Sequence, residues 1–469
     1  DKIGVPFNNP HEPKMRIGAF DFFKDGKTAA VCTWDGDVWI VSHIDDKLDK
    51  VTWKRFATGL HEPLGLKIVN EKIHTVGDNQ ITRFHDYNGD DEADFLENFN
   101  NDWENTEGFH AFCFDLHTDP EGNFYFAIGC PVRAGGRGFE RMGKHHGSVI
   151  KVSPDGKKLS IYASGFRAPN GIGVGPNGEV TTGDNEGSFV PSAPLHWVKP
   201  GSFNGVVDSY HGKRKLKSSP ILGYEIEYKD WKKYKADARE GFQHDPSEAP
   251  KPLVWMSKKR GIDNSGGGQA WVTSDKWGPL KDQLLHLSYG QSKMYVVLKE
   301  EKKGLMQGGV ARMPVELSSS AMRARINPRD GQLYTSGLKG WQTNAKGNGG
   351  LDRIRYTGKP VHLPKSLKVK KDVVEIGFYE PLDPEAANSL SQYKFGAWNL
   401  KWSFNYGSPE IPVKELELKK VELLDDGKTV VLHIPNLKPV HMAQIDYDIK
   451  SAKGEEIKGR IDHTIHVVE

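Results

Sequence analysis

One hairpin pattern recurs along most of the chain and limits what it can fold into. It consists of a β-run, a turn built from Pro, Asp or Asn with Gly, and a second β-run. The copies lie at residues 20–41, 64–84, 114–129, 171–184 and 324–337, with a looser copy at 270–298. The first four turn centres are about 45 to 56 residues apart, which is the period of four-stranded propeller blades. A blade cannot bury its face alone, so the copies must stack around a closed ring.

The sequence therefore predicts an all-β fold with two domains. Residues 1–358 are expected to form a six-bladed β-propeller with an insertion near 206–268. Beyond a linker at 362–371, alternating strands joined by turns predict a C-terminal β-sandwich of immunoglobulin or fibronectin type over 365–469. One short helix is expected at 384–391.

Charge and apolar patterning exclude several classes of protein. The net charge of +2 argues against a nucleic-acid binder. No apolar run approaches the roughly 18 residues that a membrane span needs, and no signal peptide is visible ahead of Asp1. Three cysteines give no disulfide framework, although one bridge, for example between Cys113 and Cys130, is compatible with the sequence.

Several motifs carry a resemblance to a known family. They are GFHAFCFD at 108–115, GFRAPNG at 165–171, DNEG at 184–187 and the Arg-x-Arg of 323–325. With these motifs the propeller resembles the glucose/sorbosone dehydrogenase family of soluble quinoprotein sugar dehydrogenases, which bind pyrroloquinoline quinone and calcium. TWDGDVWIV at 33–41 and NPRDGQLYTSG at 327–337 look most like the secreted propeller proteins of planctomycetes and verrucomicrobia. The resemblance implies a secreted or periplasmic protein with a carbohydrate substrate and with redox or hydrolase modules as partners.

The resemblance also implies roles for individual residues. His110 falls where the family keeps its catalytic base, and Arg167 falls on the active-site arginine. Arg323 and Arg325 resemble the pair that grips the quinone carboxylates. Ala168 stands where the family has an asparagine that contacts the quinone, and the quinone-binding lysine has no clear counterpart, which weakens the case for that cofactor.

Histidine and carboxylate side chains predict a divalent metal, either calcium or a transition metal. His145 and His146 are adjacent, and His146 is also a candidate catalytic residue. With His110 and a carboxylate from Asp184 or Glu186, they offer nitrogen and oxygen ligands. A second candidate lies in DYNGDDEAD, where oxygen ligands alternate at Asp86, Asn88 and Asp90; the competing interpretation is a solvated acidic hairpin.

Polar residues at other strand junctions are candidates for substrate binding. Equivalent loops of different blades open on the same mouth, so His61 and Glu62 are expected in its wall. The remaining candidates for hydrogen bonds to sugar hydroxyls, or for stacking on a sugar ring, are Asn170, Gln269, Tyr289, Gln307 and Trp341. No GxGxxG, Walker, GxSxG or HExxH motif is present.

Three functions remain open at this point. The first is a sugar dehydrogenase-like enzyme with His110 as base, Arg167 as electrostatic stabiliser and a cation at the mouth. The second is a metal-dependent lyase or hydrolase of keto-glycosides that works by proton abstraction and β-elimination. The third is a glycan-binding propeller without catalysis.

Overall fold

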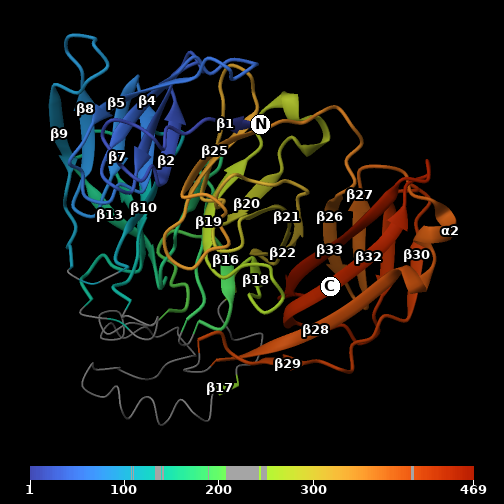
Figure 1. Cartoon of the computed structure of the whole chain (residues 1–469). Helices are drawn as coiled ribbons and strands as arrows, with labels where there is room; N and C mark the ends of the chain where they lie inside the picture. Colours follow the sequence, from blue (N-terminus) through green and yellow to red (C-terminus); the bar gives the residue numbers. More distant parts are fainter. Residues whose placement is uncertain are drawn as a thin grey trace.

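The fold is described from a computed structural model and consists almost entirely of β-strands (Figure 1). The structure describes residues 1–106, 108, 110–132, 139, 142–187, 190–206, 251–402 and 406–469, together with the backbone of 242–243. The all-β class predicted from the sequence is confirmed. Most of the expected insertion at 206–268, with its lysine-rich run at 213–217, lies outside the described residues.

Of the six four-stranded antiparallel sheets in the described part of the chain, five lie before residue 358. The first sheet consists of β2 (Ile17–Phe22), β3 (Ala29–Thr33), β4 (Val38–Ser42) and β5 (Thr52–Ala57). The second consists of β6 (Gly65–Val69), β7 (Lys72–Val76), β8 (Ile81–His85) and β9 (Phe95–Asn100). The third consists of β10 (Cys113–Thr118), β11 (Phe124–Ile128), β12 (Ser148–Val152) and β13 (Leu159–Ser164). The fourth is β14 (Ile172–Val174), β15 (Val180–Gly183), β16 (Ala193–Val198) and β18 (Val254–Met256). The fifth sheet combines three strands from later in the chain, β23 (Arg323–Ile326), β24 (Leu333–Leu338) and β25 (Gly349–Ile354), with the N-terminal β1 (Lys2–Ile3).

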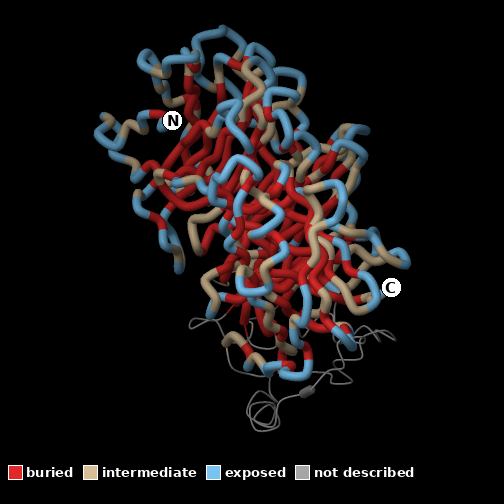
Figure 2. Tube along the Cα trace, turned by 90° about the vertical axis from the view of Figure 1, so that its right-hand side faces the viewer, coloured by how far each residue is buried: buried red, intermediate tan, exposed pale blue. Residues whose placement is uncertain are grey.

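The first strands of these sheets close a ring. A sixth antiparallel set, β19 (Gly266–Trp271), β20 (Leu284–Ser288), β21 (Lys293–Lys302) and β22 (Leu305–Arg312), lies between the fourth and fifth sheets in the chain. Strand β2 contacts β6, β6 contacts β10, β10 contacts β14, β14 contacts β19, β19 contacts β23, and β23 contacts β2. Figure 2 shows the buried residues concentrated in the interior of the molecule and the exposed residues mainly at its periphery. This closed arrangement is a β-propeller.

The hairpin turns explain why the repeating sequence folds in this way. In the first sheet Asp25 Oδ1 accepts backbone hydrogen bonds from Lys27 and Thr28, and Gly26 has a φ of 60°. The turn at Asp155 repeats this arrangement, with Gly156 at a φ of 76°. Glycine adopts this left-handed conformation without the steric cost of a Cβ, so the Asx–Gly dipeptide fixes the register of the hairpin.

The C-terminal part of the chain shares a sheet with the propeller. Strands β28 (Tyr393–Trp402), β32 (Val440–Lys450) and β33 (Glu456–Ile465) continue the sheet beyond β22 through pairs such as Gly309 with His463. The sheet also includes β17 (Phe242–Gln243), and β29 (Glu410–Pro412) pairs with β28. The facing sheet comprises β26 (Pro364–Lys370), β27 (Val373–Phe378), β31 (Thr429–His433) and β30 (Lys420–Leu423).

In this part of the chain the structure contradicts the predicted linker and confirms the predicted short helix. The linker expected at 362–371 is wrong, because most of it is strand β26, which pairs with β27. The short helix is confirmed in outline as α2 (Pro384–Ala387) followed by a 3-10 turn at Leu390–Gln392. One apolar core runs through both parts and includes Leu285, Val296, Val374 and Ile445. All three cysteines are buried thiols, so the bridge between Cys113 and Cys130 is absent.

Among the described residues, the structure contains no helix with the length and apolar character required to cross a membrane.

Candidate functional site

Loops from the sheets of the ring gather at one end of the propeller, called the mouth below. Because neighbouring strands are antiparallel, the loop that enters each first strand and the turn between the second and third strands lie at the same end of a sheet. The entering loops include residues 58–64, 110–112 and 165–171, and the turns include 77–80, 142–147 and 184–187. Histidine, arginine and carboxylate side chains from distant parts of the sequence are thereby brought to one face.

Aromatic side chains form one wall of the mouth. The ring of Trp341 stacks on Phe112 with centroids 5.5 Å apart and meets Tyr289 at 4.6 Å and Trp34 at 5.7 Å. Trp341 is half-buried and keeps part of its surface accessible. The predicted stacking residue therefore lies in an aromatic cluster at the mouth, where a flat sugar face can pack.

His110 lies against this wall. Its imidazole meets Trp341 edge-on, with centroids 6.1 Å apart, and its backbone has a φ of 74°. A non-glycine residue rarely adopts this conformation, and such residues concentrate at functional sites. Burial, aided by the charge of Arg167, lowers the pKa of His110 to about 4. The imidazole is therefore neutral at physiological pH and able to accept a proton.

Arg167 is buried beside the mouth, and a loop from the C-terminal part of the chain covers it. It donates a hydrogen bond to Asn185 Oδ1, and its guanidinium lies 5.4 Å from the ring centroid of Tyr406. Gly187 leaves room for this side chain, because a Cβ there would lie 2.2 Å from Arg167 Nε and would force the arginine to shift. Nothing in the sequence signals that Tyr406 reaches this site, because the contact joins residues far apart in the chain.

The carboxylate of Asp184 holds the loop that carries Arg167. Its two oxygens accept hydrogen bonds from the backbone N–H groups of Arg167 at 2.6 Å, Ala168 at 2.8 Å and Asn185 at 2.7 Å. Burial raises the pKa of Asp184 to about 6 and that of Glu186 to about 7. Lys258 lies 3.8 Å from Glu186. The three backbone hydrogen bonds that Asp184 accepts give it a structural role, in addition to the predicted role as a metal ligand.

His145 and His146 each use one ring nitrogen inside the protein. Nδ1 of His145 accepts a hydrogen bond from the backbone N–H of Glu104 at 3.2 Å, and Nδ1 of His146 accepts one from Gly143 at 2.8 Å. Glu104 Oε2 in turn accepts from the backbone of Lys144 at 2.8 Å. The loop is thus ordered by these two rings, and Glu104 is a neighbouring carboxylate that the sequence analysis did not identify.

A compact group of metal-ligand side chains lies at another point of the mouth. One ligand atom each from His61, Glu62 and Asp78 lie within 4.8 Å of one another. Burial, followed by the charge of Glu62, raises the pKa of Asp78 to about 7. Among the described residues this is the only such group of His, Cys, Asp and Glu, and the metal candidates predicted from the sequence do not form one. Asp78 was missed because a single aspartate in a turn carries no local signal.

The two arginines predicted to bind the quinone carboxylates form hydrogen bonds inside the ring of sheets. Arg323 is fully buried and donates to the backbone carbonyls of Asn170 at 2.6 Å and Leu64 at 2.9 Å. Arg325 donates to Asp115 Oδ1 at 3.0 Å, and Arg323 lies 3.5 Å from the same oxygen. The guanidinium groups of Arg323 and Arg325 tie first strands together, and this arrangement does not fit a role in binding quinone carboxylates.

Three of the predicted sugar-binding residues have interior partners. Gln269 accepts from the Thr181 hydroxyl at 3.1 Å and donates to the Gly267 carbonyl at 2.7 Å. The Tyr289 hydroxyl donates to the Trp341 carbonyl at 3.2 Å. Gln307 lies on strand β22 rather than in a mouth loop, and its Oε1 accepts from the backbone of 466 and 467. The structure therefore does not bring Gln307 to the mouth.

Asn170 differs from those three residues in the hydrogen bonding of its side chain. Its side chain is 1% exposed, and neither its amide nitrogen nor its amide oxygen has a hydrogen-bond partner among the described residues. Nε1 of Trp34 is also buried without an acceptor there. Buried polar groups in native proteins are generally paired with protein, water or ligand, so these atoms are suited to hold water or a substrate hydroxyl.

The predicted calcium loop lies at the opposite end of its sheet from the mouth, because it joins β8 to β9. Asp86 accepts hydrogen bonds from the backbone of Gly89 at 2.7 Å and Asp91 at 3.0 Å. Asn88 and Asp90 accept backbone bonds in the same loop, from Asp90 at 3.0 Å and Glu92 at 2.9 Å. The loop is exposed, and a structural cation there stays a prediction.

Fold and site together define a β-propeller with an aromatic mouth that carries histidine. No protein-family model matches the sequence, and no curated protein matches it significantly. Among solved structures, the chain is similar to an oxidoreductase (glucose dehydrogenase) from Thermus thermophilus, with a TM-score of 0.51 and 14% identity over 72% of this chain and 96% of the other. It is also similar to a second glucose dehydrogenase, with a TM-score of 0.50 and 12% identity over 73% of this chain and 97% of the other. At these identities the likeness establishes the fold.

Proposed function

We propose that the chain is a carbohydrate-active propeller enzyme of the sugar dehydrogenase-like class, acting at the mouth. The observation that carries this proposal is the placement of His110, a neutral imidazole in strained backbone against the aromatic face of Trp341. The glucose dehydrogenases that share the fold support the class of reaction. The proposal includes six blades, a C-terminal immunoglobulin-like sandwich and a secreted or periplasmic location.

Each of four residues of the mouth has its own role in the proposed reaction. The sugar ring packs on Trp341, and its hydroxyls pair with the buried amide of Asn170. His110 accepts the proton of the hydroxyl group that reacts. Arg167, whose charge already acts on His110, stabilises the oxyanion that forms.

Pyrroloquinoline quinone does not fit the two arginines expected to hold it. The guanidinium groups of Arg323 and Arg325 already bind Asp115 and backbone carbonyls in the interior of the ring. No step of the proposal passes through the quinone. The hydride that leaves the sugar carbon is taken up by a soluble two-electron acceptor, the role that the dye has in the assay below, and the carbon that carried the hydroxyl becomes a carbonyl.

The test is dye reduction on a panel of aldoses and keto-sugars, with and without added quinone and calcium. We expect turnover with at least one sugar, and we expect His110→Asn to lower kcat by about 100-fold or more with little change in KM. Activity of the wild type should fall as pH drops toward 4, because His110 becomes protonated. The matched control is the exposed His43, whose change to Asn should leave the kinetics unchanged.

Absence of turnover on every sugar, in a protein that still binds them, would instead support the glycan-binding function. Unchanged kinetics in His110→Asn would remove His110 from the mechanism.

A second function is favoured by the group formed by His61, Glu62 and Asp78. Two carboxylates and an imidazole within 4.8 Å could hold a divalent cation, either calcium or a transition metal. Such a cation would polarise the carbonyl of a keto-glycoside, while His110 takes the proton from the adjacent carbon. The C–H electrons then form a C=C bond, and the glycosidic oxygen leaves with its sugar, which completes a β-elimination.

Calorimetric titration with Ca²⁺, Mn²⁺ and Zn²⁺ tests this second function. We expect one bound cation per chain and a loss of affinity of at least about tenfold in Asp78→Asn. Chelation should abolish formation of the unsaturated product from a keto-disaccharide. The exposed Asp46→Asn is the control and should bind the cation normally. Elimination that persists in chelator, or an unaltered titration in Asp78→Asn, would contradict the assignment.

A further inference from the structure

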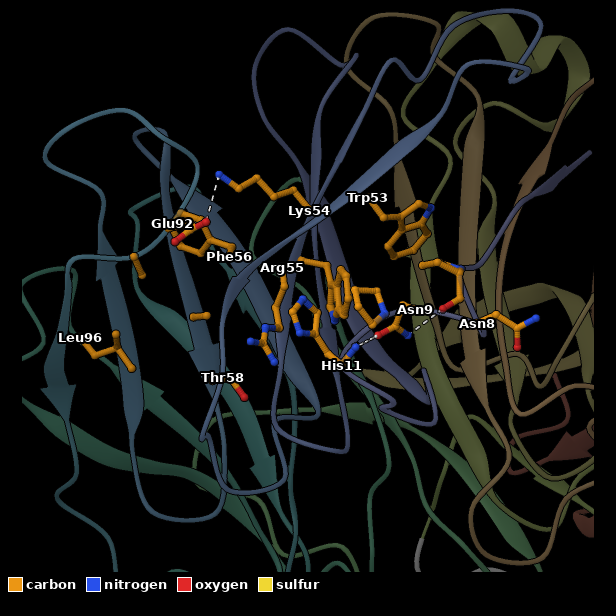
Figure 3. Close-up of a pocket in the computed structure, with 15 residues that line it drawn as sticks. Asn8, Asn9, His11, Trp53, Lys54, Arg55, Phe56, Thr58, Glu92 and Leu96 are labelled. Carbon is orange, nitrogen blue, oxygen red and sulfur yellow. Dashed lines mark hydrogen bonds and ion pairs between the residues drawn. The ribbon is translucent and has the colours of Figure 1, made fainter.

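A pocket on the propeller lies apart from the mouth residues described above. It has a volume of about 710 Å³ and opens between the N-terminal segment and strand β5 of the first sheet. Figure 3 shows Asn8, Asn9 and His11 of the N-terminal segment together with Trp53, Lys54 and Arg55 of β5, with Arg55 drawn beside His11. Thr58, the first residue of the mouth loop 58–64, is shared with this pocket, and none of the side chains given a role at the mouth lines it.

Two donors in the pocket have no partner among the residues that the structure describes. Trp39 and Arg55 are directly opposite each other on β4 and β5. Trp39 is 3% exposed, and its indole Nε1 has no hydrogen-bond acceptor among the described residues. No carboxylate in the described part of the chain lies within ion-pair distance of the half-buried Arg55, whereas the adjacent Lys54 pairs with Glu92 at 3.3 Å. Within the described part of the chain, the pocket thus holds a guanidinium without an ion-pair partner next to a buried ring whose N–H has no acceptor.

The remaining lining indicates which anion would fit. Trp53 is half-buried, with its Nε1 donating to the Gly4 carbonyl at 2.8 Å, so the ring is fixed. Asn8 and Thr58 are exposed polar residues at the rim. An aromatic face with neutral hydrogen-bonding groups suits a sugar ring, and a planar guanidinium suits a carboxylate, which it can bind in bidentate fashion.

We propose that this pocket is an accessory binding site for a carboxylate-bearing sugar, a uronic acid unit within an oligosaccharide or polysaccharide. Arg55 binds the carboxylate, the ring packs on Trp53, and a hydroxyl oxygen accepts the Trp39 N–H. The exposed pair of Lys54 and Glu92 leaves the rim close to neutral, so recognition of the anion rests on Arg55. The site is independent of catalysis at the mouth and would hold the chain on an acidic glycan.

Binding of galacturonic acid oligomers, measured by calorimetry and by quenching of tryptophan fluorescence, tests the proposal. We expect the tetramer to bind and a neutral galactose tetramer to bind at least about tenfold more weakly. Arg55→Gln should weaken the acidic ligand by about tenfold or more, and raised salt should weaken the wild type toward the same level. Trp39→Phe, which keeps the ring and removes the N–H, should weaken binding severalfold.

The matched control is Arg312→Gln, an exposed arginine on β22 that should leave binding unchanged. Thermal melting of each variant separates a lost contact from a lost fold. No binding of the acidic tetramer, equal binding of the neutral one, or unchanged affinity in a folded Arg55→Gln protein would overturn the proposal. Equal affinity for acetate and for the uronate would show a general carboxylate site and overturn the assignment to sugars. Dye reduction at the mouth should be unaffected by Arg55→Gln, so failure here is distinguishable from failure of the proposed function.

Discussion

Among the residues that the structure describes, several ionisable side chains are buried without a charged partner, and their protonation should control stability. His463 is the clearest case. It is 0% exposed on strand β33, and neither ring nitrogen has a hydrogen-bond partner among the described residues. Burial lowers its pKa from 6.5 to about 3. The folded state therefore requires the neutral ring, while the unfolded state takes up a proton below about pH 6.5.

The direction of the pH effect follows from that depressed pKa. The stability that depends on neutral His463 is complete above pH 6.5 and is lost as pH falls toward about 3. We expect His463→Met, which fills similar volume without titrating, to gain stability relative to the wild type by about 1 kcal/mol or more between pH 8 and pH 5. Denaturant unfolding at both pH values measures the difference.

An exposed histidine provides the comparison. His43→Asn, which changes a histidine at the surface, is unfolded at the same two pH values for comparison. A constant difference between His463→Met and the wild type at all pH values would show that His463 contributes packing alone.

At the scale of elements, local sequence was sufficient to predict the hairpins. Each Asx–Gly turn is specified by side-chain acceptors and a positive φ within a few residues, as at Asp25 and Gly26. Such short-range rules also placed His110, Arg167 and Trp341 in loops that share one end of their sheets. The alternation of polar and apolar residues in 365–469 predicted strands, and strands are present.

Pairings between distant residues could not be predicted in the same way. The partners of Arg323 and Arg325 lie more than 200 residues earlier at Asp115 and Leu64. The cover of Tyr406 over Arg167 and the approach of Asp78 to His61 are also set by tertiary packing. Gln307 was misplaced because its polarity resembles that of a binding residue, while its true partners are the backbone groups of 466 and 467.

At the scale of the whole molecule, the propeller and the C-terminal strands behave as one structure. Strand β33 pairs with β22, and a single apolar core includes Leu285 and Ile445 on the two sides of this junction. Interfaces that are both hydrogen-bonded and apolar resist independent motion. The wild type should therefore unfold in one cooperative transition across this junction.

Substitution at the junction tests that expectation. Gly309 has Asp462 O and His463 Cβ at 2.7 Å from the position that a Cβ would take. We expect Gly309→Val to destabilise the protein by about 1–3 kcal/mol, because the added side chain forces β22 and β33 apart. Calorimetry should show a lowered midpoint. Gly4→Ala, where nothing lies within 4 Å, should be neutral.

Two separate transitions in the wild type, with only one shifted by Gly309→Val, would show that the two parts unfold independently.

The pairing of β22 with β33 has a further consequence during synthesis on the ribosome. Gly308 to Ala311 leave the exit tunnel about 150 residues before their partners at Ile461 to Thr464. Once β25 has also emerged, at Ile354, the ring of sheets is complete in sequence, while the outer edge of β22 still has free backbone groups. Such an edge pairs readily with strands of other chains. Nascent chains that stall between these two points should therefore be the ones that depend on chaperones.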